Sequence, residues 1–188
     1  MIDTDRRMSE TILDTCCLIN LYASQSLEAI IKSSTEKALV SRTVLGEILY
    51  VRQPDDEDPD QLVPEEVRLG PFIERRVLHP TDLSGDVELE RFVTLASVVD
   101  DGEAACLAIA ASRGLVVATD DRRAIRVAAE LGVSTVSTPE LVKTWVKNAS
   151  PEPIAVTHAI KRIERYGKFR PHFSSPYLEW WSGFTEDL

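Results

Sequence analysis

Acidic residues stand at points of the sequence where a predicted strand ends or a predicted helix begins: Asp14, Glu47, Glu103, Asp120 and Asp121. In a chain that alternates strands and helices, such positions gather at one edge of a parallel sheet, so acids far apart in sequence meet in space. Carboxylate oxygens are the ligands that Mg²⁺ and Mn²⁺ prefer. The pattern therefore predicts a divalent metal site of the kind that hydrolyses phosphodiester bonds.

The local position of each acid suits this chemistry. Asp14 ends a short apolar strand, and Asp120 and Asp121 follow the apolar run at 115–118, so all three are expected at the same rim of the sheet. Glu103 lies in the first turn of a predicted helix, where the positive end of the helix dipole holds an anion in place.

Each acid also has an ordinary structural explanation. Asp14 and one of the pair Asp120–Asp121 precede helices and are natural N-caps. Glu47 can be a solvated helix residue, and Glu103 can simply complement the helix dipole. These explanations weaken when the acids are taken together, because helix capping does not require an acid at every strand end on one side of a sheet.

Polar residues beside the acids are candidates for supporting roles. The hydroxyls of Thr15 and Thr119 would orient carboxylates or water, although Thr is also common at strand ends. Arg122 and Arg123 are candidates for contact with a substrate phosphate, and a solvated helix face explains them equally well.

The hydrophobic pattern predicts alternating strands and helices. Apolar segments predict strands at 11–14, 37–40, 76–78, 115–118 and 133–137. Helices are expected at 17–23, 27–31, 83–96, 122–131 and 157–166. One more helix is expected to be capped by Asp101 and ended by Gly114, one to run from a cap at Ser41 through Tyr50, and one to be capped by Thr138. This order predicts a parallel sheet with right-handed crossovers.

Composition and charge leave a nucleic-acid partner open. The chain has 188 residues, 44% of them apolar, and a net charge of −10, which taken alone argues against binding phosphates. Seven acids and no base lie in 54–66, within a Pro-rich stretch expected to form a loop, and they supply most of that charge. Basic residues gather at 113–126 and 161–170.

Targeting signals and cysteine usage favour a cytoplasmic protein. No apolar run approaches the ~20 residues of a membrane span, and the first ten residues lack the apolar stretch of a signal peptide. The three cysteines have neither disulfide-framework nor zinc-site spacing.

Three blocks of the sequence resemble the PIN domain family. The segment ILDTCCLINLYA is similar to its opening strand with an Asp followed by Thr or Ser, and SRTVLGEILY is similar to its second acidic element. The most specific block, DDGEAACLAIAASRGLVVATDDRRAIRVAAELGV, resembles the helix–strand–helix of one PIN branch. The resemblance extends from residue 11 to about residue 147.

The resemblance implies a three-layer α/β/α fold with a mainly parallel sheet, and a metal-dependent endoribonuclease. Its ligands for Mg²⁺ or Mn²⁺ would be Asp14, Glu47, Glu103 and Asp120 or Asp121, with both members of the last pair as candidates. Such proteins are often toxins, so an antitoxin and a homodimer are candidate partners beside the RNA substrate. A non-catalytic PIN-like binding module and a structure-specific DNA nuclease are the alternatives.

Two features depart from the minimal pattern of the family. Glu103 stands where many members have Asp, and its longer side chain can still reach a metal. We expect a catalytic domain over residues 1–150, with the acidic insertion near 54–66, and a helical, aromatic extension over 151–188 that packs on it. Stacking of the extension's aromatic residues on unpaired RNA is the alternative to packing.

Overall fold

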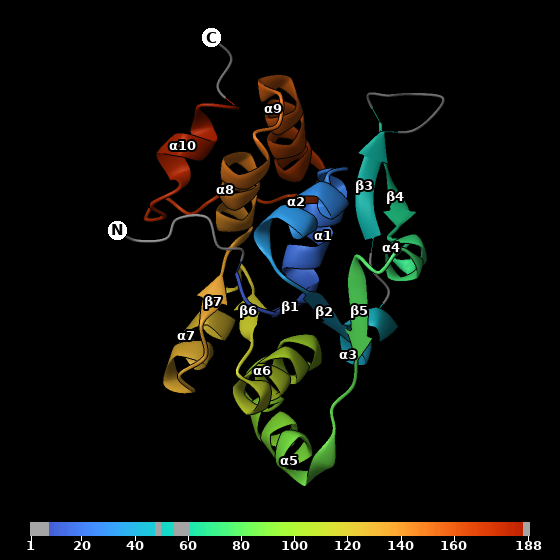
Figure 1. Ribbon diagram of the computed structural model, residues 1–188, viewed down its shortest axis with the longest axis vertical. Helices are drawn as coiled ribbons and strands as arrows, with labels where there is room; N and C mark the ends of the chain where they lie inside the picture. Colours follow the sequence, from blue (N-terminus) through green and yellow to red (C-terminus); the bar gives the residue numbers. More distant parts are fainter. Residues whose placement is uncertain (1–7, 48–49, 55–60, 186–188) are drawn as a thin grey trace.

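A computed structural model shows a parallel sheet of five strands in the order β5-β2-β1-β6-β7 (Figure 1) and describes residues 8–47, 50–54 and 61–185. The strands are β1 (Thr11–Leu13), β2 (Ala38–Ser41), β5 (Leu78–Thr81), β6 (Val116–Ala118) and β7 (Thr135–Val136). All four pairings are parallel, and the central strands β1 and β2 are entirely buried. Continuous apolar strands of this kind are expected where helices cover both faces of a sheet.

Helices cover the sheet on both faces, so the predicted three-layer α/β/α architecture is confirmed. Contacts place α6 against β1, β2 and β6, with α3, α5 and α7 around it, while α1 packs with α2 and α8. Figure 1 shows these two groups on opposite sides of the sheet. The helices are α1 (Thr15–Ala23), α2 (Leu27–Ser34), α3 (Arg42–Gly46), α4 (Gly70–Glu74), α5 (Gly85–Leu95), α6 (Asp101–Arg113), α7 (Arg122–Glu130), α8 (Thr138–Ala149), α9 (Pro153–Arg162) and α10 (Leu178–Ser182).

The helix expected from Ser41 through Tyr50 is wrong beyond its first turns. Ser41 does cap α3, since its hydroxyl accepts the Val44 N–H at 3.1 Å, but the helix ends at Gly46. Tyr50 begins β3 (Tyr50–Pro54), which pairs antiparallel with β4 (Leu62–Glu66). Residues of high strand propensity here find a partner strand, and that pairing overrides the local helical spacing.

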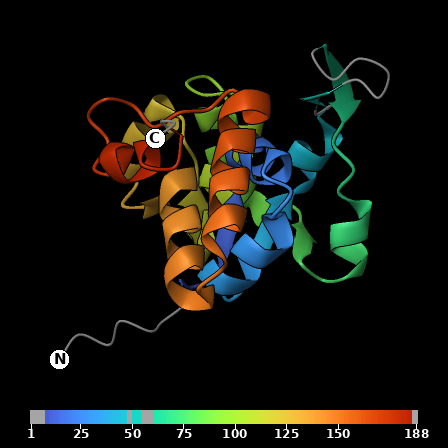
Figure 2. The same ribbon diagram turned by 90° about the horizontal axis from the view of Figure 1, so that it is seen from above.

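Strand β4 lies in the stretch expected to be a loop, so that prediction is wrong for Leu62–Glu66. Residues 55–60 of the acidic insertion lie outside the described residues, whereas Leu62–Glu66 forms a regular strand. In Figure 2 the β3–β4 hairpin stands at the opposite side of the molecule from α10. The strand predicted at 76–78 is also displaced, because β5 begins only at Leu78.

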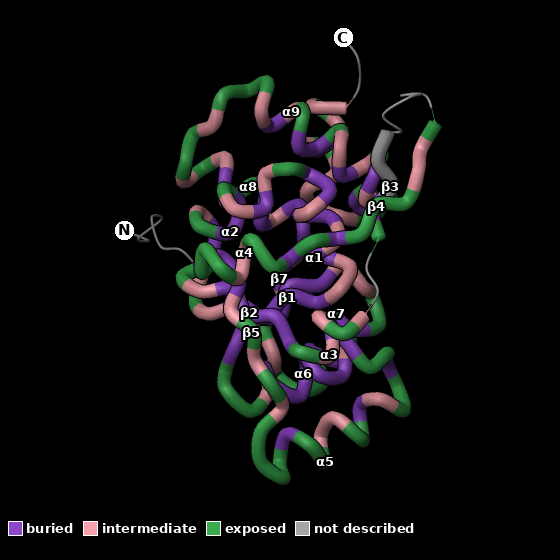
Figure 3. Tube along the Cα trace, turned by 90° about the vertical axis from the view of Figure 1, so that its right-hand side faces the viewer, coloured by how far each residue is buried: buried purple, intermediate pink, exposed green. Residues whose placement is uncertain are grey.

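The C-terminal part continues the packed core. Ile160 of α9 and Ile163 of the following π-helical turn η1 (Ile163–Gly167) are fully buried, as is Trp181 of α10. The helix predicted at 157–166 is therefore two elements, with α-helical geometry ending at Arg162. Figure 3 contrasts the buried strands with the largely exposed helix α5. The division of the chain at residue 150 stays a prediction.

No helix in the described part of the chain is long and apolar enough to cross a membrane.

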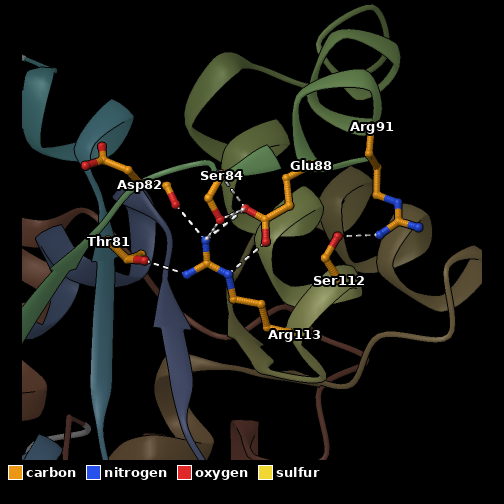
Figure 4. A network of polar contacts seen from close by, with 7 residues as sticks. All are labelled: Thr81, Asp82, Ser84, Glu88, Arg91, Ser112 and Arg113. Carbon is orange, nitrogen blue, oxygen red and sulfur yellow. Dashed lines mark hydrogen bonds and ion pairs between the residues drawn. The ribbon is translucent and has the colours of Figure 1, made fainter. Parts of the chain in front are cut away.

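A network around Arg113 fastens α5 to α6 (Figure 4). Its guanidinium binds both carboxylate oxygens of Glu88 at 2.8 Å and also donates to the Thr81 hydroxyl and the Asp82 carbonyl. The Glu88 side chain is only 7% exposed, and Arg113 lowers the pKa of that carboxyl. A buried carboxylate that depends on one cation is costly to leave alone.

We predict that Arg113→Met lowers the free energy of unfolding by about 1 to 3 kcal/mol, because Glu88 loses its charge partner while it stays buried. Arg91→Met is the matched control, since Arg91 joins the same two helices through one exposed hydrogen bond to Ser112. It should change stability by less than about 0.5 kcal/mol. Equal losses in urea denaturation would contradict the role given to Glu88.

Candidate functional site

Pairing of β1 with β6 brings two of the predicted acids to one rim. Leu13 lies opposite Ala118, and the Asp14 N–H donates to the Ala118 carbonyl at 3.0 Å. The chain turns into helices directly after both strands, so Asp14 and Asp120 leave the sheet side by side at its carboxyl edge. The predicted meeting of sequence-distant acids is seen here.

Asp14 is 1% exposed and caps α1, with its Oδ1 accepting the Cys17 N–H at 2.9 Å. Burial raises the pKa of this carboxyl to about 7, and the charge of Asp120 adds to the rise. Hydrogen bonds from Thr119, Cys17 and Cys16 oppose that rise without cancelling it. Asp14 therefore does cap a helix, and it also lies at the acidic rim.

Asp120 is held by neutral donors. Oδ1 accepts the Thr138 N–H at 2.9 Å, and Oδ2 accepts the Asn20 amide at 3.0 Å together with the Thr138 hydroxyl. Burial raises its pKa. Thr138 was expected to cap α8, but Ser137 occupies the N-cap position because the Thr138 hydroxyl turns to Asp120.

Asp121 is the member of the pair that caps a helix. Its Oδ1 accepts the N–H groups of Arg123 at 2.6 Å and Ala124 at 2.9 Å, which fixes the start of α7. The side chain is half-buried. The two adjacent acids Asp120 and Asp121 thus have different hydrogen-bond partners, and both remain at the rim of the sheet.

Glu103 faces other acids from the first turn of α6. Burial, then the charges of Asp100, Asp121 and Asp14, raise the pKa of this half-buried carboxyl to about 7. The cap of α6 is Asp100, whose carboxylate accepts the Glu103 N–H at 2.8 Å, and not Asp101 as expected. Asp101 already has helical geometry as the first residue of α6. Asp100 is an additional acid that the sequence pattern missed.

Glu47 lies just after α3 and reaches the starts of α1 and α6. Its Oε2 accepts the Thr15 hydroxyl at 2.5 Å. A Cβ on Gly102 would lie 2.5 Å from Glu47 Oε1, so only glycine at that position leaves room for this carboxylate. Thr15 therefore contacts one of the predicted acids, as expected for a residue that orients a carboxylate.

Thr119, Cys16 and Asn20 surround the acids with polar groups. Thr119 is fully buried and its hydroxyl accepts the Asp121 N–H at 3.1 Å. The Cys16 thiol contacts both Asp14 oxygens, at 3.1 and 3.3 Å. Asn20 was not predicted as a site residue, although its sequence context gave one signal: a buried amide side chain in an otherwise apolar helical segment has to find polar partners.

Arg122 and Arg123 lie on the first turn of α7 and are exposed. Arg122 comes within 3.5 Å of His172 Nε2, and neither arginine forms an ion pair with a described residue. Both residues directly follow Asp121 in the chain.

A cavity of about 350 Å³ opens beside the acids. Carboxylates of Glu103, Asp120 and Asp121 line it, and its remaining wall comes from α1 and from the C-terminal segment: Cys16, Ile19, Asn20, Gly167, Lys168 and Phe169. The contribution of residues 167–169 was not predicted from the sequence.

The donor chemistry of this site suits a hard divalent cation. Oxygen ligands predominate. Burial and then the charges of neighbouring acids raise the pKa of Asp14 and of Glu103, and the acids of the rim form no ion pair with a described cation. Within the described residues, no three carboxylate, imidazole or thiol side chains already stand at metal-binding distance. Mg²⁺ is commonly held by one or two carboxylates and several waters, so the donor set still fits it.

The sequence of residues 10–171 matches the PIN domain family. The chain belongs to that family. PIN domains are in general nucleases, and they typically use divalent metals. No curated protein gives a significant match to the chain. The family match extends beyond the resemblance found from sequence and includes α9, the turn η1 and residues 167–169 of the cavity wall.

Burial of Asp14 predicts a pH dependence of stability in the metal-free PIN domain. In the folded protein Asp14 keeps its proton up to about pH 7, against an ordinary value of 3.8, so the folded state binds more protons between these values. Stability should therefore fall as pH rises from about 4 to 7. Between pH 5 and pH 8 the parent should lose about 2 kcal/mol more than Asp14→Asn does, measured by denaturation in EDTA.

Val93→Gln is the control for this measurement, because it introduces an amide on the exposed face of α5 and removes no carboxyl. It should follow the parent at both pH values. Identical pH profiles for the parent and Asp14→Asn would show that the Asp14 carboxyl titrates alike in the folded and unfolded chain.

Proposed function

We propose that this PIN domain protein is a metal-dependent endoribonuclease. The observation that supports it best is the gathering of Asp14, Glu103, Asp120 and Asp121 at one sheet edge, buried or half-buried, without an ion pair to a described cation. Burying like charges together is unfavourable for a fold unless something else neutralises them. A bound divalent cation is the partner that such a set of carboxylates favours.

In this proposal the acids have different roles. Asp14, Glu103 and the acid pair Asp120–Asp121 hold Mg²⁺ or Mn²⁺, and Glu47 completes the acidic set from its place beside Thr15. Such an ion, when bound, polarises the phosphate and lowers the pKa of an attacking water.

The neighbouring residues are proposed to position these groups and the substrate. Thr15 and Thr119 orient the carboxylates and the backbone around them through the hydroxyl contacts already described. Arg122 and Arg123, exposed at the start of α7, contact substrate phosphates.

Single-stranded RNA is the proposed substrate and the cytoplasm the proposed location. A structure-specific DNA nuclease would use the same carboxylates, and parallel assays with both nucleic acids separate the two. The toxin role, an antitoxin partner and a homodimer stay predictions from the family resemblance. A neighbouring gene for a small DNA-binding protein would support the first two.

Purified protein should cleave single-stranded RNA with Mg²⁺ or Mn²⁺ and lose this activity in EDTA. Asp14→Asn and Glu103→Gln should each lower the rate at least about 100-fold, because each removes a charge from the acidic set. Asp86→Asn is the matched control, since Asp86 lies in the first turn of α5 and is exposed. An Asp14→Asn protein that cuts RNA as fast as the parent would remove this mechanism.

A non-catalytic binding module is the second candidate, because the described residues present no cluster of three side chains already at metal-binding distance. Calorimetric titration with Mn²⁺ discriminates the two. Heat of binding and a rise in melting temperature support the nuclease. No heat and no thermal shift at millimolar Mn²⁺, with RNA binding retained, would support the binding module.

Gly102→Ala should separate stability from activity. The new methyl group would displace the Glu47 carboxylate, which is the far end of a flexible side chain, while alanine favours the helix by about 1 kcal/mol. We therefore expect a melting temperature close to that of the parent and a rate of RNA cleavage reduced about tenfold or more.

Gly70→Ala is the control for this substitution, because a Cβ at Gly70 meets no atom within 4 Å. It should leave both quantities unchanged. Full activity in Gly102→Ala would show that the position of Glu47 does not matter to the reaction.

A further inference from the structure

The C-terminal segment supplies one wall of the acidic cavity. Gly167, Lys168 and Phe169 line it together with carboxylates that come from α6 and from the loop between β6 and α7. Among the described residues that line the cavity, Lys168 alone carries a positive charge. A cation beside carboxylates in a nuclease site is a natural contact for a substrate phosphate.

Close packing fixes this wall to the acids. A Cβ on Gly167 would lie 2.7 Å from Asn20 Oδ1, so the backbone approaches Asn20 more closely than any other residue would permit. Asn20 in turn donates to Asp120 at 3.0 Å. Contact through Asn20 therefore fixes the position of the turn η1 relative to the Asp120 carboxylate.

Lys168 adopts a backbone conformation that lysine rarely takes. Its φ is +58°, in the left-handed region, where it ends the π-helical turn η1. Residues other than Gly and Asn are disfavoured in this region by about 1 kcal/mol or more. Lys168 is exposed, and its backbone N–H donates to the Ile163 carbonyl, whereas its side chain forms no hydrogen bond or ion pair with a described residue. Its ammonium group is thus available to a ligand.

Phe169, the residue after Lys168, attaches the segment to α10. Phe169 packs edge to face on Trp181, with ring centroids 5.9 Å apart, and the Trp181 indole N–H donates to Glu164 of η1 at 3.0 Å. Trp181 is fully buried although it lies beyond the residues that match the PIN family. The extension therefore braces the cavity wall.

We propose that Lys168 binds a phosphate of the RNA substrate next to the cleaved bond and so orients the strand over the acids. The proposal rests on the proposed function and adds to it a substrate-binding residue on the C-terminal segment. Because Lys168 stands outside the acidic set, it contributes to substrate affinity and leaves the chemical step to the carboxylates.

The test compares Lys168→Asn, which keeps a residue that tolerates positive φ, with Lys168→Arg, which keeps the charge. Lys161→Gln on α9 is the control for loss of one positive charge away from the cavity. With single-stranded RNA and Mg²⁺, Lys168→Asn should raise KM about three- to tenfold and leave kcat within about twofold. Lys168→Arg and Lys161→Gln should stay near the parent.

A binding measurement provides a readout that a merely structural role would not change. In the Asp14→Asn background, fluorescence anisotropy with labelled single-stranded RNA should show that Lys168→Asn reduces the slope of log K against log salt by about 0.7, as for loss of one phosphate contact. If the parent cleaves RNA and Lys168→Asn has the same salt slope and the same KM as the parent, this inference is overturned while the proposed function stands. A parent that neither binds nor cleaves RNA would overturn the proposed function, and this inference with it.

Discussion

Burial of like charges at the carboxyl edge of β1 and β6 is the constraint on which the site depends. The Asp14 N–H bonds to Ala118 of the neighbouring strand, so the two acidic segments cannot move apart without breaking the sheet. Neutral donors stabilise the carboxylates: the Cys17 N–H for Asp14, and Asn20 with Thr138 for Asp120. Amides and hydroxyls offset part of the desolvation cost and bring no positive charge of their own, so a cation would still be favoured at this edge.

Elements whose signals are local were predictable from sequence. Gly114 ends α6 as expected, with φ at +69°, and an acid of the Asp120–Asp121 pair caps α7 as expected. The parallel sheet with helices on both faces follows from the alternation of apolar runs and helices. The predicted fold class was therefore correct, whereas the roles of the site residues stay predictions.

Features set by distant contacts were not predictable. The end of α3 depends on pairing of β3 with β4, and the partner strand lies within the second half of the acidic insertion. Thr138 has the sequence context of a helix cap, and only the fold shows that Asp120 takes its hydroxyl. The placement of residues 167–169 beside the acids required the turn η1, whose π-helical geometry leaves no pattern in the sequence.

Asn20 touches two segments that the chain separates widely, because its amide holds Asp120 while its oxygen abuts Gly167. Substitutions in either segment are consequently expected to be energetically non-additive with changes at Asn20. Grafting the C-terminal turn onto another PIN scaffold would then require transfer of the matching residue from the first helix as well. The structural unit consists of the first helix, the acidic loop and the C-terminal turn together, rather than the tail by itself.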